Sequence, residues 1–247
     1  MKIITFYNQK GGVGKTSLTF NIAYLFSLKY RTVMWDLDTQ GALSMVSQSP
    51  RDKFNDYDKI FKKKGRIRKR TFLTKWDNLF VIPAGEDLND LGVSLFDFKK
   101  SGKVAGDIAK KLSDDFDVMI IDPQATKSLL IENIIKASDY IYMPVIPNSV
   151  NMKLIDDNIS FIQSCKAGRK IAGIIPNMTD LRKKVHQESM EELKKNYSAL
   201  YMDVFIPSCS KMEEIYLRSQ PIELFAKRSK AALALREIYQ KIEAKIL

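Results

Sequence analysis

Residues 10–17 read KGGVGKTS and lie between an apolar run, KIITFY at 2–7, and an amphipathic stretch, SLTFNIAYLFSLK at 17–29. A strand, a glycine-rich loop and a helix in this order are the context of a phosphate-binding loop. The glycines let the backbone wrap closely and point its N–H groups inward, and the helix start places its positive dipole end at the phosphates. The sequence therefore predicts a nucleotide site built by Lys10, Gly11, Gly12, Val13, Gly14, Lys15, Thr16 and Ser17.

Two side chains of this loop carry its expected chemistry. Lys15 supplies a charge near the β- and γ-phosphates, and the Thr16 hydroxyl can bind Mg²⁺. The general pattern GxxxxGK[ST] would place a glycine where this chain has Gln9, and a second lysine, Lys10, precedes the two glycines. This form, KGGVGKT, resembles the deviant Walker A motif of the ParA/MinD family of ATPases. The resemblance implies that Lys10 reaches across a dimer interface to the partner's nucleotide, so that two positive charges face the transferring phosphoryl group.

A second motif, DLDTQG at 36–41, follows an apolar strand. It is similar to the family's DxDPQG segment, with Thr39 in place of the proline. The resemblance implies that Asp38 orients or activates the attacking water, and that Asp36 helps to order the Mg²⁺ environment. The alternative for each aspartate is a strand-end cap or a turn residue.

A third motif, DVMIIDPQ at 117–124, resembles a Walker B strand. The resemblance implies that Asp122 holds Mg²⁺, directly or through water. The family usually has Thr-Pro after this aspartate, whereas this chain has Pro123 and Gln124. This departure removes no charge, but it changes the residues that set the local geometry of the switch. The three motifs occur in order at the carboxyl ends of strands, where open α/β sheets bind ligands.

Apolar runs alternate with amphipathic stretches, which predicts βα units and a mostly parallel sheet. We expect a single α/β P-loop NTPase domain over 1–247, with helices on both faces of a twisted sheet of about seven or eight strands and no separate N-terminal DNA-binding module. The irregular stretch 47–77 predicts a basic surface excursion. The expected strands are 2–7, 32–36, 78–82, 117–122, 140–145, 171–176 and 202–206. The expected helices are 15–29, 86–98, 103–112, 128–137, 151–165, 182–196, 210–218 and 229–246.

The resemblance continues into the C-terminal half of the chain. The segment GIIPNMTD at 173–180 falls where family members contact the adenine base, which implies that contact for Asn177. Its amide can both donate and accept, and a turn-capping asparagine is the alternative. The segment IPSCSKMEEI at 206–215 is similar to the family's IPRxxRxxEA stretch and implies that Pro207 lines the base pocket.

Forty basic and 29 acidic residues give a net charge of +11. This balance favours an anionic partner such as nucleic acid, an anionic membrane or an acidic protein, the alternative being a merely basic surface. No uncharged apolar run approaches about 18 residues, so no spanning helix is expected. Cys165 and Cys209 lie far apart, and the only histidine is His186, so a disulfide or metal cluster is not expected and a reducing cytosol fits.

The resemblance implies a nucleotide switch rather than a metabolic enzyme. An iron–sulfur role is not expected, because neither cysteine has a partner at ligand spacing. Membrane anchoring is not expected either, because the amphipathic segment 229–246 also has the pattern of a docked final helix. We expect an ATPase for DNA segregation that uses ATP and Mg²⁺, forms a homodimer when ATP-bound, and turns over slowly until a ParB-type centromere-binding protein stimulates it. It would act in the cytoplasm, associated with the nucleoid; the alternative is a MinD-type positioning ATPase at a membrane or protein scaffold.

Non-specific DNA binding requires phosphate contacts and no base readout. The run KKKGRIRKR at 62–70, seven of whose nine residues are basic, is a further candidate for such contacts, and a solvated loop is its alternative. The expected DNA-binding residues are Lys211, Arg218, Lys227, Arg228 and Lys230.

Overall fold

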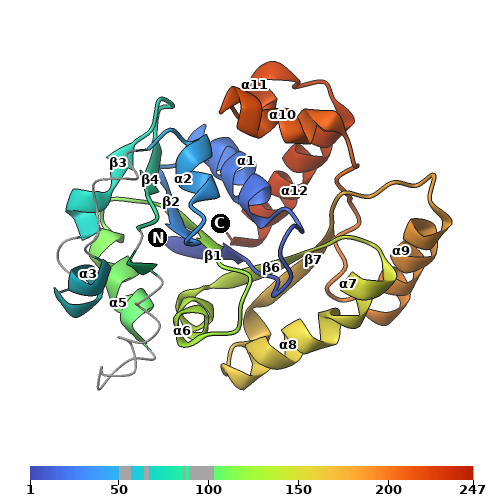
Figure 1. Cartoon of the computed structure of the whole chain (residues 1–247), viewed down its shortest axis with the longest axis horizontal. Coiled ribbons are helices and arrows are strands. Elements are labelled where there is room, and N and C mark those ends of the chain that lie inside the picture. The colour runs from blue at the N-terminus through green and yellow to red at the C-terminus, as the bar shows by residue number, and fades with distance from the viewer. Residues whose placement is uncertain (50–56, 64–66, 86, 89–102, 247) are drawn as a thin grey trace.

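The structure is a computed structural model that describes residues 1–49, 57–63, 67–85, 87–88 and 103–246. Its strands are β1 (Lys2–Phe6), β2 (Thr32–Leu37), β3 (Phe72–Leu73), β4 (Leu79–Ile82), β5 (Val118–Pro123), β6 (Tyr140–Val145) and β7 (Ile171–Pro176). Within the described residues these strands form one seven-stranded sheet in the order β3-β4-β2-β5-β1-β6-β7 (Figure 1). The short edge strand β3 pairs antiparallel with β4, and the other described neighbours are parallel. The predicted α/β fold with a mostly parallel sheet is confirmed.

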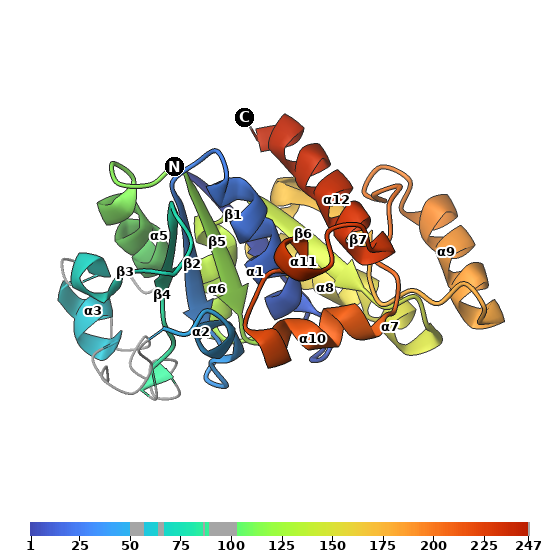
Figure 2. The ribbon, with the colours of Figure 1, turned by 90° about the horizontal axis from the view of Figure 1, so that it is seen from above.

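Helices cover both faces of the sheet. They are α1 (Lys15–Ser27), α2 (Ala42–Val46), α3 (Tyr57–Lys63), α5 (Val104–Ala109), α6 (Leu129–Ala137), α7 (Ser149–Lys153), α8 (Ile155–Ser164), α9 (Lys184–Asn196), α10 (Ser210–Arg218), α11 (Ile222–Phe225) and α12 (Lys230–Ile246). Helices α1 and α12 pack on one face, and α5, α6 and α8 pack on the other (Figures 1 and 2). None of the helices in the described part of the chain combines the length and the apolar character needed to span a lipid bilayer.

The central strands are buried on both faces, which explains their nearly continuous apolar sequences. Every residue of β2 and of β5 is buried. Because side chains alternate between the faces of a strand, Val33 and Trp35 join the core beneath α5 and α6, whereas Met34 joins the core beneath α1. The chain therefore has one apolar core on each side of the sheet.

Strand β1 lies inside the sheet, between β5 and β6, and delivers the glycine loop to the sheet's carboxyl edge. Its neighbours β5 and β6 pair with it in parallel register. The loop leads directly into α1, nearly all of whose residues are buried. A loop held between a central strand and a buried helix is fixed at both ends.

The segment 202–206 is not a strand, contrary to the prediction from its apolar sequence. It runs beside β7, next to an isolated bridge between Tyr201 and Ile174. The Val204 N–H donates to the Met202 carbonyl at 2.7 Å, which turns the backbone within the segment. That turn prevents a continuous ladder, although Met202 itself is buried.

One other expectation needs revision. The predicted helix 151–165 is divided into α7 and α8, with Leu154 between them.

Two expectations fall wholly or partly outside the described residues. The predicted helix 86–98 stays a prediction, because only positions 87 and 88 of it are described. The basic excursion 47–77 and its run 62–70 are described in part, and there the run ends in a short 3-10 turn at Ile67–Arg70. Arg70 is buried over the Tyr57 ring, 4.1 Å from its centroid, so this member of the run is not a solvated cation.

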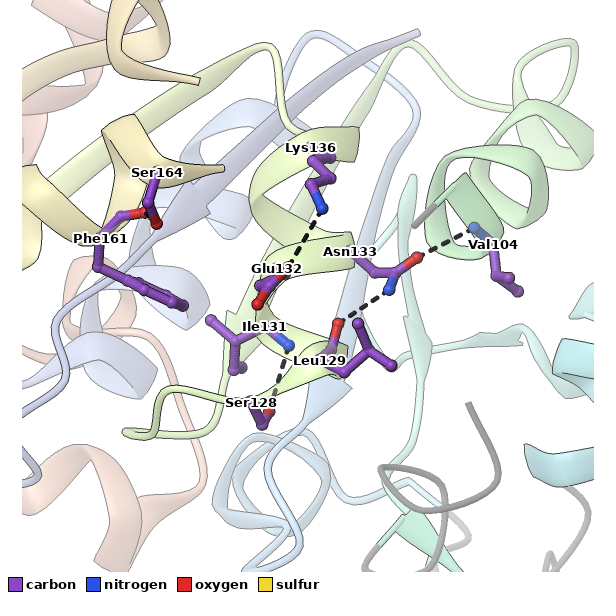
Figure 3. Close-up of polar contacts among 9 residues, drawn as sticks. All are labelled: Val104, Ser128, Leu129, Ile131, Glu132, Asn133, Lys136, Phe161 and Ser164. Carbon is purple, nitrogen blue, oxygen red and sulfur yellow. Dashed lines mark hydrogen bonds and ion pairs between the residues drawn. The ribbon is translucent and has the colours of Figure 1, made fainter. Parts of the chain in front are cut away.

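Helix α6 shows how the sequence fixes an element next to the sheet (Figure 3). The Ser128 hydroxyl caps its start by accepting a hydrogen bond from the Ile131 N–H at 3.3 Å. One turn later the buried Asn133 amide donates to the Leu129 carbonyl at 2.8 Å and accepts from the Val104 N–H at 3.1 Å. Val104 is the first residue of α5, whose opening N–H groups have no partner within their own helix. Asn133 thus joins α6 to the start of α5.

Replacing Asn133 with alanine is expected to lower the free energy of unfolding by about 1–3 kcal/mol, because the buried Val104 N–H would be left without a partner. Urea unfolding monitored by circular dichroism measures the change. The control is Glu132→Ala on the same helix, which removes a partly exposed ion pair with Lys136 and is expected to cost about 0.5 kcal/mol or less. Equal destabilisation of the two variants would contradict this account of Asn133.

Candidate functional site

The glycine loop begins with a set of asparagine contacts. The buried Asn8 side chain accepts a hydrogen bond from the Lys10 N–H at 2.9 Å and donates to the Pro144 carbonyl at 2.9 Å. Asn158, on α8, donates to Asn8 at 3.3 Å and accepts from the Gln9 N–H at 2.9 Å. The loop entrance is therefore fastened to β6 and α8 before the glycines begin.

The far side of the loop is held by Gly14 and Asn177. Gly14 has a φ of +87°, and a Cβ on it would lie 2.3 Å from Asn177 Nδ2, so no other residue fits there without displacing that amide. Asn177 Nδ2 donates to the Val13 carbonyl at 2.7 Å, and its Oδ1 accepts from the Met178 N–H at 2.9 Å. Both ends of this buried amide thus bind the chain's own backbone. The adenine contact of Asn177 stays a prediction, as does that of Pro207, which bridges to Thr179 beside it.

Lys15 is buried inside the loop. Its ammonium donates to the Lys10 carbonyl at 3.3 Å, across the mouth of the loop. Burial lowers the pKa of Lys15, and the charges of Asp122 and then Asp38 oppose that shift. An anion bound at the loop would therefore meet a poorly solvated cation, which makes their attraction strong.

Two carboxylates face each other at the carboxyl ends of β2 and β5. The strand register places Asp36 opposite Asp122. Asp36 is fully buried and accepts three hydrogen bonds, from the Ser44 N–H at 2.8 Å, the Ser44 hydroxyl at 2.6 Å and the Asp38 N–H at 3.1 Å. Burial raises the pKa of Asp36 to about 6, although the bonds from Ser44 and Asp38 oppose the shift.

Asp122 has a different environment, although it is equally buried. Neither of its carboxylate oxygens makes a hydrogen bond of normal geometry to another described residue. Burial and the neighbouring Asp36 raise its pKa well above the usual range, while the Thr16 hydroxyl and the Lys15 ammonium act in the other direction. Buried polar atoms without partners are rare in folded proteins, and a bound ion is one of the ways in which they are satisfied.

These residues suit a divalent cation. Mg²⁺ prefers oxygen ligands and is commonly bound by one or two carboxylates together with phosphate oxygens and water. Asp122 offers two oxygens that make no hydrogen bond of normal geometry to another described residue, next to the Thr16 hydroxyl and opposite Asp36. In the described ranges no group of three or more His, Cys, Asp and Glu residues could hold a metal ion by itself, so the phosphates would have to complete the site.

Asp38 begins a turn directly after β2. Its carboxylate accepts a hydrogen bond from the Gln40 N–H at 3.0 Å, and its carbonyl accepts from the Gly41 N–H at 2.9 Å. Its charge acts on both Lys15 and Asp122, which brings the three predicted site residues into one electrostatic cluster. Lys10 joins this cluster through its backbone, and its side chain lies half-buried at the loop entrance.

Several residues of the site were not predicted from the sequence. Tyr216, on α10, places its hydroxyl 3.0 Å from the Ser17 hydroxyl, and burial raises its pKa. Asn8 adjoins the loop motif and could have been suspected from that position. Ser44, Asn158 and Tyr216 belong to no recognised motif, because their roles depend on how distant segments pack.

The predicted DNA-binding residues are all exposed or half-buried and lie on or between α10 and α12 (Figures 1 and 2). Two of them share one carboxylate, since Glu214 pairs with Lys211 at 2.6 Å and with Arg218 at 2.9 Å. Within the described residues no ion pair joins the other three, Lys227, Arg228 and Lys230. Their charge is therefore the least neutralised part of this surface.

Comparisons with known proteins agree with this geometry. A family model described as an AAA domain matches residues 1–172. The chromosome-partitioning ATPase Soj of Treponema pallidum is 27% identical over 249 residues, which cover 99% of this chain and 98% of that protein. Two solved structures have a similar fold. Cyanothece McdA in complex with ATP has a TM-score of 0.88 at 18% identity, covering 98% of this chain and 96% of that one. The septum site-determining protein MinD of Pyrococcus horikoshii, complexed with Mg-ADP, has a TM-score of 0.76 at 19% identity, covering 98% and 96%.

Asp122→Asn is expected to stabilise the nucleotide-free protein at pH 7.5 by about 1–3 kcal/mol, because it removes a buried charge whose burial and repulsion by Asp36 outweigh the opposing effects of Thr16 and Lys15. The raised pKa means that the folded state holds its proton more tightly than the unfolded state does. Stability is therefore fully present below about pH 4 and falls as pH rises, so the advantage of the variant should vanish near that pH. Urea unfolding at several pH values measures the difference.

The same variant is expected to lose the extra thermal stability that Mg²⁺ and ATP together give the wild type. Asp157→Asn, an exposed change on α8, is the control and should alter neither result. A wild-type response to Mg²⁺ and ATP in Asp122→Asn would contradict the assignment of Asp122 to the metal.

Proposed function

The chain belongs to the ParA/MinD family of P-loop ATPases, and from this premise we propose that it is an ATP-dependent switch that dimerises on ATP, binds DNA non-specifically and releases it after hydrolysis. The observation that carries the proposal is the charge cluster around the glycine loop, in which Lys15 and Asp122 are buried and Asp38 is half-buried. Such a cluster suits a bound nucleoside triphosphate with a divalent cation.

Each residue of the cluster has one role in this proposal. The loop N–H groups, the start of α1 and Lys15 bind the phosphates. Thr16 and Asp122, with Asp36 behind them, hold Mg²⁺, which when bound neutralises charge on the phosphate oxygens. Asp38 orients the attacking water, in the manner of the general bases of other phosphoryl-transfer sites. The positions of the reacting groups, rather than covalent chemistry by the protein, account for the reaction.

Dimerisation would complete the site. The Lys10 backbone is occupied by Asn8 and Lys15, whereas no hydrogen bond or ion pair of its ammonium occurs among the described residues. A lysine held by its backbone with its charge unused is suited to reach a nucleotide on a second subunit. Two lysines would then face one triphosphate and favour its hydrolysis.

The DNA-binding part of the proposal rests on α10 to α12. Lys227, Arg228 and Lys230 carry the least neutralised charge of this surface, and a dimer doubles the number of phosphate contacts, which raises affinity through effective concentration. The Tyr216–Ser17 contact joins α10 to the glycine loop, so a change at the nucleotide can reach this surface. The relative named as a chromosome-partitioning ATPase supports DNA as the cargo.

The rate of hydrolysis and the partner follow from the proposed cycle. A switch whose ATP-bound state must last requires slow intrinsic hydrolysis. A ParB-type centromere-binding partner would accelerate this hydrolysis, and the protein would act in the cytoplasm, on the nucleoid.

A MinD-type role at a lipid surface is disfavoured by α12. The apolar side of this helix is buried, and its Tyr239 ring lies 4.8 Å from the Phe26 ring of α1. That helix is docked on the fold and does not offer its apolar side to a membrane.

Substitutions in the cluster are expected to separate ATP binding from hydrolysis. Lys15→Ala should weaken ATP binding by about 100-fold or more, since the phosphates would no longer meet the buried cation. Asp38→Ala should bind ATP and dimerise but lower kcat by about 100-fold or more. Lys10→Ala should bind ATP yet fail to form the ATP dimer. Equilibrium binding, light scattering after size exclusion and phosphate release measure the three properties.

Normal hydrolysis by Asp38→Ala would show that its role is assigned wrongly. A normal ATP-induced dimer of Lys10→Ala would likewise contradict the proposed contact of Lys10 with the nucleotide of a second subunit. Lys184→Ala, an exposed change on α9, is the control for removal of a lysine and should behave as the wild type.

The DNA surface is expected to act through phosphate contacts. With ATP, the triple variant Lys227→Ala, Arg228→Ala, Lys230→Ala should bind a non-specific duplex about tenfold or more weakly. The slope of log K against log salt should become shallower by about 0.9 for each phosphate that the variant no longer neutralises. Fluorescence anisotropy at several salt concentrations measures both. The charge-matched control is Lys110→Ala, Lys111→Ala, Lys166→Ala, which changes three exposed lysines that follow α5 and α8, the helices that pack on the other face of the sheet from α12. Equal weakening by the control would contradict the assignment.

A further inference from the structure

The turn that carries Asp38 is joined to the end of β5 by a side-chain contact. The chain leaves β2 through Asp38 and Thr39, and it leaves β5 through Gln124. Just beyond the paired strands, the Gln124 amide donates a hydrogen bond to the Thr39 hydroxyl at 2.9 Å. Both side chains are half-buried, so water competes with this bond only in part.

The hydrogen bonds of Asp38 itself are local. Asp38 donates to Asp36 and accepts from Gln40 and Gly41, all within residues 36–41. These bonds set the shape of the turn around the carboxylate. The contact from Gln124 links this turn to the end of the strand that carries Asp122.

Both positions differ from the family motifs that this chain resembles, which have proline where it has Thr39 and Gln124. A proline side chain can neither accept nor donate this hydrogen bond. The contact therefore requires a residue other than proline at both positions.

We propose that Gln124 is a positioning residue for ATP hydrolysis, which holds Asp38 in place relative to Asp122 through the Thr39 hydroxyl. The inference rests on the proposed function, since hydrolysis with the help of Asp38 is part of it. Gln124 touches neither nucleotide nor water in this account and acts through the turn alone.

The experiment compares Gln124→Ala, Thr39→Val, their double variant and the conservative Thr39→Ser. The first two should lower kcat about fivefold, as expected for removal of one hydrogen bond, and leave the Kd for ATP within about twofold, because the glycine loop is untouched. The double variant should be no slower than Thr39→Val, since Gln124 acts only through the Thr39 hydroxyl, which that variant already lacks. Thr39→Ser keeps the hydroxyl and should hydrolyse ATP close to the wild-type rate.

A second measurement does not depend on hydrolysis. Hydrogen exchange of the amides of Gln40 and Gly41 in the nucleotide-free protein should be faster in Gln124→Ala and Thr39→Val than in the wild type or Thr39→Ser. Gln240→Ala, an exposed glutamine change on α12, is the control and should change neither exchange nor kcat.

Wild-type exchange of these amides in Gln124→Ala would overturn the proposal, as would additive reductions of kcat in the double variant. A wild-type chain that hydrolyses ATP no faster than Lys15→Ala would instead overturn the proposed function, and the catalytic part of this inference with it. Faster exchange with an unchanged kcat would overturn the positioning role and show that the hydrogen bond is structural.

Discussion

Two buried carboxylates, Asp36 and Asp122, lie opposite each other because β2 and β5 are adjacent parallel strands in register. Two like charges in a buried position are unfavourable unless each finds compensation. The fold supplies it for Asp36 through three hydrogen bonds from Ser44 and the Asp38 backbone. For Asp122 the described residues supply no hydrogen bond of normal geometry, and the Thr16 hydroxyl and the Lys15 ammonium oppose the rise of its pKa without preventing it. A cation bound there would complete the compensation, and the stability of the chain would then depend on its ligand.

The elements around the glycine loop connect the nucleotide site to helix α10. The glycine loop is fixed on one side by Asn8 and on the other by Asn177, so it has little freedom of its own. Ser17 at its end contacts Tyr216 on α10, the helix that also carries Lys211 and Arg218. A nucleotide that moves the end of the loop would therefore act, through one side chain, on the helix that carries these two cations.

The sequence was sufficient for the elements whose signals are local. The glycine loop, the strand ends that carry Asp36 and Asp122, and most helices follow from periodicity and motif spacing. The strand expected at 202–206 fails because a turn at Val204, which periodicity does not reveal, interrupts the ladder. Ser44, Asn158 and Tyr216 could not be predicted, since each acts on a residue that only the packing of distant segments brings near. Asn177 was found as a residue of the site, but its contact with the Val13 carbonyl is a feature of the tertiary structure.

Bound nucleotide is proposed to control affinity for DNA, and this is the central claim. The most direct measurement is the Kd of the wild-type protein for a non-specific duplex with ATP and Mg²⁺, with ADP and Mg²⁺, and without nucleotide, at one fixed salt concentration. The account predicts tight binding with ATP and binding at least about tenfold weaker in the other two states, as expected when a dimer doubles the phosphate contacts. Equal affinity in all three states, in a protein that binds ATP and dimerises, would contradict it.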